Sequence, residues 1–452
     1  MTRSGKPGRD EGQAGLARPR RPLGGLLAYR NFRLLWIGET VNQFGSAMAT
    51  VVVPLLAVIV LHASTFEVSV LTAANFLPWL VIGLPAGAWV DRLPGRQVMV
   101  VCDLISALLY ASVPSAAWLG ILTLAQLVLV VLLGGATNVL FATAYQVNLT
   151  SLVAAEQLTE GNAKLQGSAS AASLGGPGLA GVAARYLGAA PALLVNAASF
   201  LVSCWCLLRI RPPRAAAAAA AARPAAAPVA TPRARLRTDI VEGIRLVARD
   251  NRLRRLSIFG GLANFAFDGY AALIIVFLVR VVRVGEAEVG LLMALPGVGG
   301  VLGALVARRA AARYGSARIL LISVWGATPF VLLIPLAGPG PRIGFLVVGS
   351  LVAVVGIAVS NVIMATFRQT YSPEGMLGRV SATMRFLVLG TGPLGALAGG
   401  ALGTWLGVRT GLWIMLTLVS LSGLTLASRD FARGRDLPSG RMPAAAEPVA
   451  AD

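Results

Sequence analysis

Acidic and amide side chains interrupt long apolar stretches of this sequence at two places. Glu39 is followed by Asn42 and Gln43, at the i+3 and i+4 spacing that places side chains on one face of a helix. Asn264 and Asp268 form a similar i, i+4 pair in the second half of the chain. Ionisable groups inside apolar, membrane-embedded helices are rare and mark functional positions. Glu39 and Asp268 are therefore candidate proton-coupling carboxylates, and the three amides are candidates for the wall of a substrate cavity.

The sequence leaves two roles open for Glu39. A carboxyl group in a medium of low dielectric can hold a proton near neutral pH, so Glu39 can gain and lose a proton as a site faces each side of a membrane. Alternatively, Glu39 pairs permanently with a cation such as Arg33, two turns earlier, and only fixes its helix. Asn138, Asn196 and Asn361 also interrupt apolar segments. They either line a cavity or form hydrogen bonds between helices.

Several kinds of chemistry are excluded by residues that the sequence lacks. A phosphate-binding P-loop needs a lysine between glycine and serine or threonine, and neither Lys6 nor Lys164 has that context. His62 is the single histidine, which excludes histidine-based metal clusters and catalytic triads. The three cysteines lie in apolar segments: Cys102, Cys204 and Cys206. The sequence predicts no cofactor, no metal site and no enzyme activity, and it leaves an ion or proton gradient as the usual energy source.

The elements that must position these residues are predicted to be membrane-spanning helices. The chain has 452 residues, 56% hydrophobic and 13% charged, with a mean hydropathy of +0.75. A soluble domain carries roughly 25% charged residues, and a bilayer-crossing helix needs about 20 apolar residues. Twelve segments qualify: 34–61, 68–90, 98–118, 121–143, 167–187, 189–208, 256–279, 288–307, 319–337, 343–366, 382–403 and 405–427. The predicted fold class is an all-α polytopic membrane protein with twelve transmembrane helices.

The distribution of basic residues predicts the orientation of the chain. Its formal net charge is +20, with 39 Lys and Arg residues, and cytoplasmic loops of membrane proteins carry the excess of such residues. With the N-terminus inside, the predicted outer loops hold only Arg185, Arg280, Arg283, Arg342 and Arg409. We therefore expect both termini in the cytoplasm and a location in the bacterial inner membrane. The positive charge then serves topology, and no nucleic-acid partner is expected.

The predicted spans form two groups of six, separated by a polar interruption. That interruption contains Ala215 to Ala222 and several prolines, which are typical of a low-complexity linker, and then a short amphipathic helix ending near Arg249. The predicted parts are a disordered cytoplasmic N-terminus, an N-terminal six-helix half, a cytoplasmic linker, a C-terminal six-helix half and a cytoplasmic tail: 1–30, 31–210, 211–255, 256–428 and 429–452.

Two features recur at one offset and indicate that the halves are repeats. A Gly-Pro pair occurs in the fifth and eleventh predicted spans, 216 residues apart: Gly176-Pro177 and Gly392-Pro393. A glycine that precedes a basic segment recurs in degraded form, again 216 residues later: Gly87-x3-Asp91-Arg92 and Gly303-x3-Ala307-Arg308. The shared offset predicts two pseudo-symmetric six-helix halves. Transporters built from such repeats bind substrate between them, near the bilayer midplane.

Gly87 begins a charged segment after the second predicted span. Asp91, Arg92 and Arg96 follow it on the cytoplasmic side, and Asp103 shares a helix face with Arg96. A carboxylate there can pair with neighbouring arginines or with the positive end of a helix, and Gly87 lets another helix approach. These five residues are predicted to form a cytoplasmic gate. The alternative is an interfacial charge cluster that ends a helix.

The fifth predicted span combines proline with small residues. Pro177 removes a helical hydrogen bond, and Gly176 and Gly181 allow close contact between helices. Gly392 and Pro393 repeat the arrangement in the eleventh span. Ordinary helix packing is one explanation of these five residues, and a helix-packing motif of exporters is the other.

Several of these segments resemble a known family. The segment from Gly87 to Arg96 resembles the cytoplasmic-loop signature of the major facilitator superfamily, and the Gly176-Pro177 segment resembles the Gly-Pro signature of its exporters. Residues 28–427 most resemble the drug-exporter branch that includes macrolide efflux proteins and the enterobactin exporter. The other segments that carry the resemblance are Asn31-Phe-Arg33-Leu-Leu-Trp36, Ala144-Tyr145-Gln146, Glu156-x-Leu158-x-x-Gly-Asn162, and Arg368-Gln369-x-x-Ser-Pro373-Glu374 followed by Gly378-Arg379. Many relatives have an acid where this chain has Ser46 or Ala142.

The resemblance implies the major-facilitator fold and a latch around Asp91 that closes the cytoplasmic side. It also implies export of a hydrophobic or amphipathic small molecule, a drug or a secondary metabolite, in exchange for protons. The protein is expected to act as a monomer. Alternatives are a siderophore exporter, an uptake permease, and a membrane sensor or assembly factor that has the fold without transporting.

Overall fold

The computed structural model describes residues 25–90, 93–153, 157–210, 244–371, 377–427 and 434–437, and these residues contain helices and short connections but no strand. A 3-10 helix, η1 (Gly25–Ala28), begins the N-terminal half. Six long helices follow: α1 (Arg30–Ile59), α2 (Thr65–Val90), α3 (Gly95–Trp118), α4 (Leu124–Leu152), α5 (Leu158–Leu187) and α6 (Ala189–Arg209).

The C-terminal half repeats this order with more irregular turns. Its helices are α9 (Asn251–Val276) continued by η3 (Phe277–Val282), α10 (Glu286–Tyr314), α11 (Ser316–Leu321) continued by η4 (Ile322–Ala327) and η5 (Thr328–Leu336), α12 (Ile343–Tyr371) after η6 (Gly340–Arg342), α13 (Leu377–Trp405), and α14 (Val408–Ser422) continued by η7 (Gly423–Leu426). Residues 244–249 form a short helical segment before α9, where the amphipathic linker helix was expected.

Each of the twelve predicted spans coincides with one helix or one continuous series of helices. Ten spans are long and apolar enough to cross a membrane within the described residues. Two further long helices, α5 and α13, complete the two groups of six. The predicted fold class is confirmed. Most of residues 1–30, 211–255 and 429–452 lies outside the described residues.

Several helices extend beyond the apolar segments that predicted them. α4 continues to Leu152, α5 begins at Leu158 and α12 continues to Tyr371, whereas the apolar segments stop near 143, 167 and 366. Hydropathy marks the part of a helix that lies in hydrocarbon, but backbone hydrogen bonds continue into the polar turns beyond it. The apolar segments therefore predicted the positions of the spans but underestimated the lengths of these helices.

The ninth span is not a regular α-helix. α11 passes into the π-helical turn η4 and then into the 3-10 helix η5. Pro329 and Pro335 lie in η5 and cannot donate backbone hydrogen bonds. The helix therefore changes its hydrogen-bond register within the span, and its apolar composition gave no sign of this.

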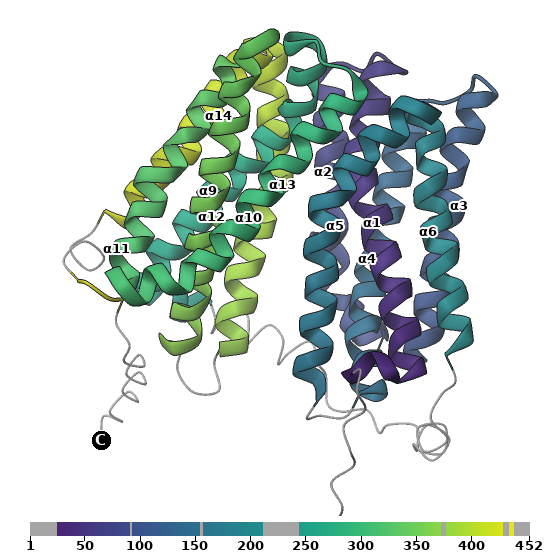
Figure 1. Ribbon diagram of the computed structural model, residues 1–452, viewed down its shortest axis with the longest axis horizontal. Coiled ribbons are helices and arrows are strands. Elements are labelled where there is room, and N and C mark those ends of the chain that lie inside the picture. The colour runs from purple at the N-terminus through teal and green to yellow at the C-terminus, as the bar shows by residue number, and fades with distance from the viewer. Residues whose placement is uncertain are drawn as a thin grey trace, which may run out of the picture.

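The two halves meet along two equivalent helix pairs. α2 packs against α13, and α5 packs against α10 (Figure 1). At the offset of 216 residues, α2 corresponds to α10 and α5 to α13, so the two pairs are related by the internal repeat. Within the halves, α1 packs against α5 and α6, and α9 packs against α13 and α14.

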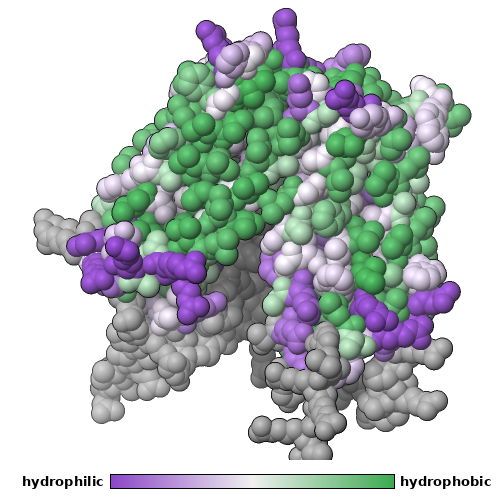
Figure 2. All heavy atoms as spheres, viewed as in Figure 1, coloured by the Kyte–Doolittle hydropathy of each residue, from purple (hydrophilic) through white to green (hydrophobic). Residues whose placement is uncertain are grey.

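The molecule has two ends that differ in the connections they carry. We call the end where α1 and α9 begin and α6 ends the linker face, and the opposite end the distal face (Figure 1). Figure 2 shows apolar side chains over the sides of both halves, with polar side chains gathered near the two ends. The same view shows a notch between the halves that opens at the linker face.

Candidate functional site

Glu39 and Gln43 form a hydrogen-bonded pair on α1. Gln43 Nε2 donates to Glu39 Oε1 at 2.7 Å, across one helical turn. The other carboxylate oxygen, Oε2, is buried and has no hydrogen-bond partner among the described residues. Arg33, the cation considered as a permanent partner, is exposed, and the described residues show no ion pair between it and Glu39. One oxygen of Glu39 is thus available to bind a proton.

Polar groups from two other helices lie near Glu39. Asp103 on α3 and Tyr145 on α4 lie near enough for electrostatic interaction with it. Asp103 is only 1% exposed, and Ser203 on α6 lies within hydrogen-bonding reach of its carboxylate. Asp103 Oδ2 and the Tyr145 hydroxyl are buried without partners in the described ranges. We call Glu39, Asp103 and Tyr145 the buried acid cluster.

A cavity of about 660 Å³ lies beside the Glu39–Gln43 pair. All six helices of the N-terminal half line it, together with Ala271 and Ile275 of α9. Its lining carries no charged residue. The neutral polar residues are Gln43, Ser46, Thr50, Thr72, Asn75, Asn138 and Ser173. The apolar lining is aliphatic with four aromatic side chains: Phe76, Trp79, Tyr110 and Phe200. We call it the N-cavity. Its lining suits an aromatic or amphipathic molecule held through neutral hydrogen-bonding groups.

Asn264 and Asp268 form the corresponding pair on α9, with acid and amide in reverse order. Asn264 Nδ2 donates to Asp268 Oδ2 at 2.7 Å and to the carbonyl of Val388 on α13 at 2.9 Å. Asp268 is 6% exposed. It lies against Gly392 of α13, where a Cβ atom would be 2.8 Å from Asp268 Oδ2. The pair therefore uses both amide hydrogens and ties α9 to α13.

A second cavity, of about 750 Å³, lies within the C-terminal half. Its lining is mainly apolar and includes Phe259, Phe267, Met364 and Met384. Arg368 is the single charged residue of this lining. Its neutral hydrogen-bonding residues come from several helices: Asn264, Thr328, Ser360, Asn361 and Ser422. We call it the C-cavity.

The predicted cavity residues separate into two groups. Gln43 and Asn138 line the N-cavity, and Asn264 and Asn361 line the C-cavity. Asn42 corrects the expectation, because it is 7% exposed, accepts a hydrogen bond from Ser46 at 3.4 Å, and lines neither cavity. One residue step rotates a helix position by about 100°, which turns Asn42 away from the space that Gln43 faces.

Glycine contacts close the molecule at the distal face. A Cβ atom at Gly181 of α5 would lie 2.8 Å from the Cα of Gly290 on α10, and one at Gly290 would lie 2.5 Å from Gly181 Cα. At the equivalent pair, Gly400 of α13 lies directly on Ser69 of α2. Arg280 of η3 also donates a hydrogen bond to the carbonyl of Ala63, between α1 and α2. Together these contacts join the two halves at the distal face.

The three described residues of the predicted gate, Gly87, Arg96 and Asp103, lie in different surroundings in this structure. Arg96 donates from Nε and NH2 to the carbonyls of Leu207 and Leu208, both at 2.8 Å, and so caps the end of α6. Asp103, expected beside Arg96, lies instead in the buried acid cluster. A Cβ atom at Gly87 would meet no described atom within 4 Å. Asp91 and Arg92 lie outside the described residues.

The glycines of the Gly-Pro segments lie in close contact with neighbouring helices. Gly176 lies on Ala47 of α1, and Gly392 lies on Asp268 of α9, so each segment packs against the first helix of its own half. Gly181 makes the contact with α10 described above. Both helices continue through their prolines, Pro177 and Pro393.

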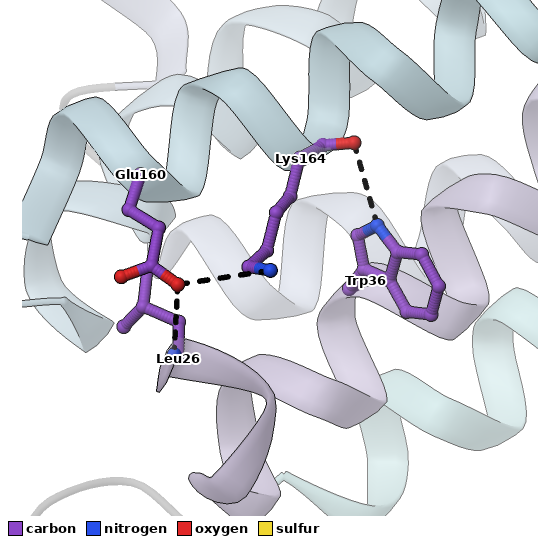
Figure 3. Close-up of polar contacts among 4 residues, drawn as sticks. All are labelled: Leu26, Trp36, Glu160 and Lys164. Carbon is purple, nitrogen blue, oxygen red and sulfur yellow. Dashed lines mark hydrogen bonds and ion pairs between the residues drawn. The ribbon is translucent and has the colours of Figure 1, made fainter. Parts of the chain in front are cut away.

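Two features of the site were not predicted from the sequence. Tyr145 was noted only within a motif, and its place beside Glu39 depends on how α4 packs. A brace also ties the start of α1 to α5: Leu26 N donates to Glu160 Oε1 at 3.1 Å, Lys164 pairs with the same oxygen at 3.7 Å, and Trp36 Nε1 donates to the Lys164 carbonyl at 3.5 Å (Figure 3). Glu160 and Lys164 were visible as an i, i+4 ion pair, but their partners on η1 and α1 were not.

Two equivalent six-helix halves, with cavities beside buried carboxylates, are the architecture of a membrane transporter built from repeats. Comparison with known families agrees with this class. The chain matches the model of the Major Facilitator Superfamily over residues 35–392 and belongs to that family.

Individual proteins similar to this chain are also transporters. The multidrug efflux pump Tap of Mycolicibacterium fortuitum is 29% identical over 388 residues, which cover 84% of this chain and 90% of Tap. A crystal structure of the nucleoside transporter NupG superposes with a TM-score of 0.71 at 12% identity, covering 87% of this chain and 98% of that chain. A bacterial homologue of the iron transporter ferroportin, in an inward-facing state, gives 0.68 at 18% identity, covering 88% and 97%. The two structures share the fold of this chain.

Proposed function

We propose that this transporter exports amphipathic small molecules in exchange for protons. The observation that carries the proposal is the Glu39–Gln43 pair, because it connects a buried carboxylate directly to a cavity wall. Proton binding at Glu39 and substrate binding in the N-cavity then affect the same side chain. Coupling of two ligands requires such a shared element.

The orientation and the state of the molecule complete the proposal. With the linker face in the cytoplasm of a bacterial inner membrane, both termini lie inside. The structure is then an inward-open form, because its glycine contacts lie at the distal face and the notch opens at the linker face (Figure 2). The ferroportin homologue of similar fold is described as inward-facing. Substrate enters from the cytoplasm in this state, and the protein acts as a monomer.

The direction of transport and the kind of substrate rest on two supports. Tap, which aligns over 84% of this chain, is a multidrug efflux pump. The N-cavity combines aromatic side chains with uncharged polar ones, which suits amphipathic aromatic compounds of varied shape. We therefore expect export of such compounds rather than of one small polar nutrient.

The test is transport by purified protein in liposomes with an imposed pH gradient. Ethidium, an aromatic amphipathic cation, is the probe. The wild-type protein is expected to accumulate it against its gradient only when the pH gradient is present. Glu39→Gln keeps the shape and removes the titration, so it should bind ethidium but lose uphill transport. Glu288→Gln, an exposed change at the distal start of α10, is the matched control and should transport normally. Uphill transport by Glu39→Gln equal to that of the wild type would refute Glu39 as the coupling group.

Orientation has its own test by thiol labelling of intact cells. Ser115 is exposed near the distal face and Ala312 is exposed near the linker face, while the three native cysteines are buried. A cysteine at Ser115 should react with an impermeant reagent added outside, and one at Ala312 should not. Labelling of the Ala312 variant alone would reverse the orientation.

A further inference from the structure

Gln43 stands between the N-cavity and Glu39. Its Nε2 donates to Glu39 Oε1 at 2.7 Å, and its side chain lines the cavity. This is the single hydrogen bond that Gln43 makes within the described part of the chain. An amide has a donor end and an acceptor end. With Nε2 directed at Glu39, the carbonyl oxygen of Gln43 is the end available to a molecule in the cavity.

We propose that the Gln43 amide reverses its direction when Glu39 binds a proton, and that this reversal carries the coupling. The inference rests on the proton exchange proposed above. Ionised Glu39 only accepts hydrogen bonds, so Gln43 must donate to it and presents an acceptor to the cavity. When Oε2 has bound a proton, the carboxyl group can turn and donate this O–H to the Gln43 carbonyl oxygen, which turns Nε2 into the cavity.

The reversal assigns a chemical class to the substrate. With Glu39 ionised, the cavity offers an acceptor and binds a molecule that donates an N–H or O–H group. A proton arriving from the distal side in the outward-open state replaces that acceptor by a donor. Two donors then face each other and the bound molecule is released. The proton leaves Glu39 to the cytoplasm after the return, so one proton moves inward for each substrate that moves outward.

The C-terminal half shows why Gln43, and not Asn264, can act in this way. Both hydrogens of Asn264 Nδ2 are engaged, by Asp268 Oδ2 and by the Val388 carbonyl. Turning that amide would place its own oxygen against the Val388 carbonyl, so its direction is fixed. Gln43 has one bond to exchange and the longer side chain.

Among the described residues, four groups or pairs near Glu39 can titrate or carry charge. They are Asp103 on α3, Tyr145 on α4, Cys206 on α6 beside Gly38, and the Lys164–Glu160 ion pair of α5 near Trp36. Lys164 and Glu160 already satisfy each other. Asp103 and Tyr145 lie near Glu39, but neither lines the N-cavity. Gln43 is the residue that transmits the change to the substrate.

The test compares two permanent aromatic cations whose charge does not vary with pH. Ethidium carries amino groups that donate hydrogen bonds, and tetraphenylphosphonium carries none. Both cations interact with the charge of Glu39, but only ethidium can donate a hydrogen bond to the carbonyl oxygen of Gln43. In the purified wild-type protein, raising the pH through the titration of Glu39 should tighten ethidium binding about fivefold more than tetraphenylphosphonium binding, which is the effect of one hydrogen bond.

Variants then separate the switch from simple packing. Gln43→Met keeps the side-chain length and removes both amide ends, so the difference between the two probes should disappear. Gln126→Met is the matched control, since Gln126 Nε2 donates to the Ser112 carbonyl near the distal face, away from the N-cavity. It should keep the difference. Equal pH responses of the two probes in the wild type, or a difference that persists in Gln43→Met, would overturn the proposal.

A measurement without substrate keeps the switch distinct from the transport activity. With nitrogen-15-labelled glutamine, the side-chain amide signal missing from Gln43→Met identifies Gln43. It should shift with pH in the wild type and stay constant in Glu39→Gln. A signal that does not respond to pH in the wild type overturns the switch, even if proton-driven transport is found. A signal that responds as expected, in a protein that shows no proton-driven transport, supports the switch and refutes the proposed function.

Discussion

The two halves of this transporter share a fold but place different chemistry at their centres. In the N-terminal half the acid precedes the amide, and Glu39 lies about 14 Å along α1 from its first residue. In the C-terminal half the amide precedes the acid, and Asp268 lies about 26 Å along α9. Each amide lines a cavity, but Gln43 makes one hydrogen bond, to Glu39, whereas Asn264 makes a second one to a neighbouring helix. The duplication therefore preserved helices and not side-chain roles.

The same halves are alike where they touch. Each contributes its fifth helix, α5 or α13, to a crossing at the distal face, and each crossing depends on glycine. At Gly290 the neighbouring atoms belong to the α5 backbone, and at Gly400 they belong to the Ser69 side chain. The glycines at the helix crossings are thus common to both halves, because the halves close on each other there. The acid–amide pairs differ between the halves.

The largest effect is expected at the crossings, where the halves are alike. An alanine at Gly290 would place Cβ 2.5 Å from backbone atoms of Gly181 and Pro177, so α5 and α10 must separate. Overpacking of this kind costs about 1–3 kcal/mol. We expect Gly290→Ala and Gly400→Ala each to lower ethidium transport in liposomes by about 10-fold or more, and to lower the melting temperature in detergent.

A change on the same surface provides the control. Gly178 faces Ala294 at an ordinary distance, 3.8 Å from a Cβ atom to the Ala294 Cβ. Gly178→Ala should therefore behave like the wild type. Normal transport by Gly290→Ala would show that the crossing is not needed, and a strong effect of Gly400→Ala alone would show that the two crossings differ.

A smaller effect is expected at Asp268, where the halves differ. Asp268→Asn keeps an oxygen that accepts from Asn264 and loses the charge of a charge-assisted bond, which differs from a neutral one by about 1 kcal/mol. We expect transport in liposomes to fall about fivefold while accumulation against the gradient persists. Glu39→Gln, in contrast, should abolish accumulation. If Asp268→Asn abolished accumulation and Glu39→Gln did not, the roles of the halves would be exchanged.

The smallest effect is expected at the hydrogen bond that links the halves at the distal face. Arg280→Gln removes the bond to the Ala63 carbonyl, worth about 1 kcal/mol, and should raise the outward-open population about fivefold. A cysteine at Thr50 in the N-cavity reports this as faster labelling from outside. Arg283→Gln, at an exposed residue of the same connection, is the control. Equal labelling rates in both variants would mean that the bond does not stabilise the closed face.

Much of the fold could be predicted because bilayer spans have a strong local signal. Apolar runs of sufficient length located all twelve spans, and the two recurrent glycine features located the repeat. The polar ends of α4 and α12 and the register changes of the ninth span were missed, because neither alters hydropathy. Local spacing also predicted the Glu39–Gln43 and Asn264–Asp268 pairs, since residues four apart share a helix face.

The parts of the site that were missed depend on contacts between distant segments. Nothing near Asp103 in the sequence shows that α3 and α6 bury it close to Glu39, and its spacing from Arg96 suggested a different partner. Gly181 and Gly290 belong to different halves of the chain, so the sequence around either glycine does not predict their contact. The prediction that Asn42 lines a cavity was wrong for a simpler reason. The polar stripe on α1 is wider than the part of the helix that faces the N-cavity.

The C-terminal segment at residues 434–437 has a practical consequence. Asp436 Oδ1 accepts from Ser316 N at 2.9 Å, the Ser316 hydroxyl accepts from Leu437 N at 2.9 Å, and Arg435 lies directly over Gly315. Leu437 is 8% exposed and belongs to the apolar cluster at this end of the C-terminal half. These contacts hold residues 434–437 against the turn between α10 and α11. A truncated chain that stops before Gly434 loses these contacts, whereas a purification tag placed after Leu437 keeps them.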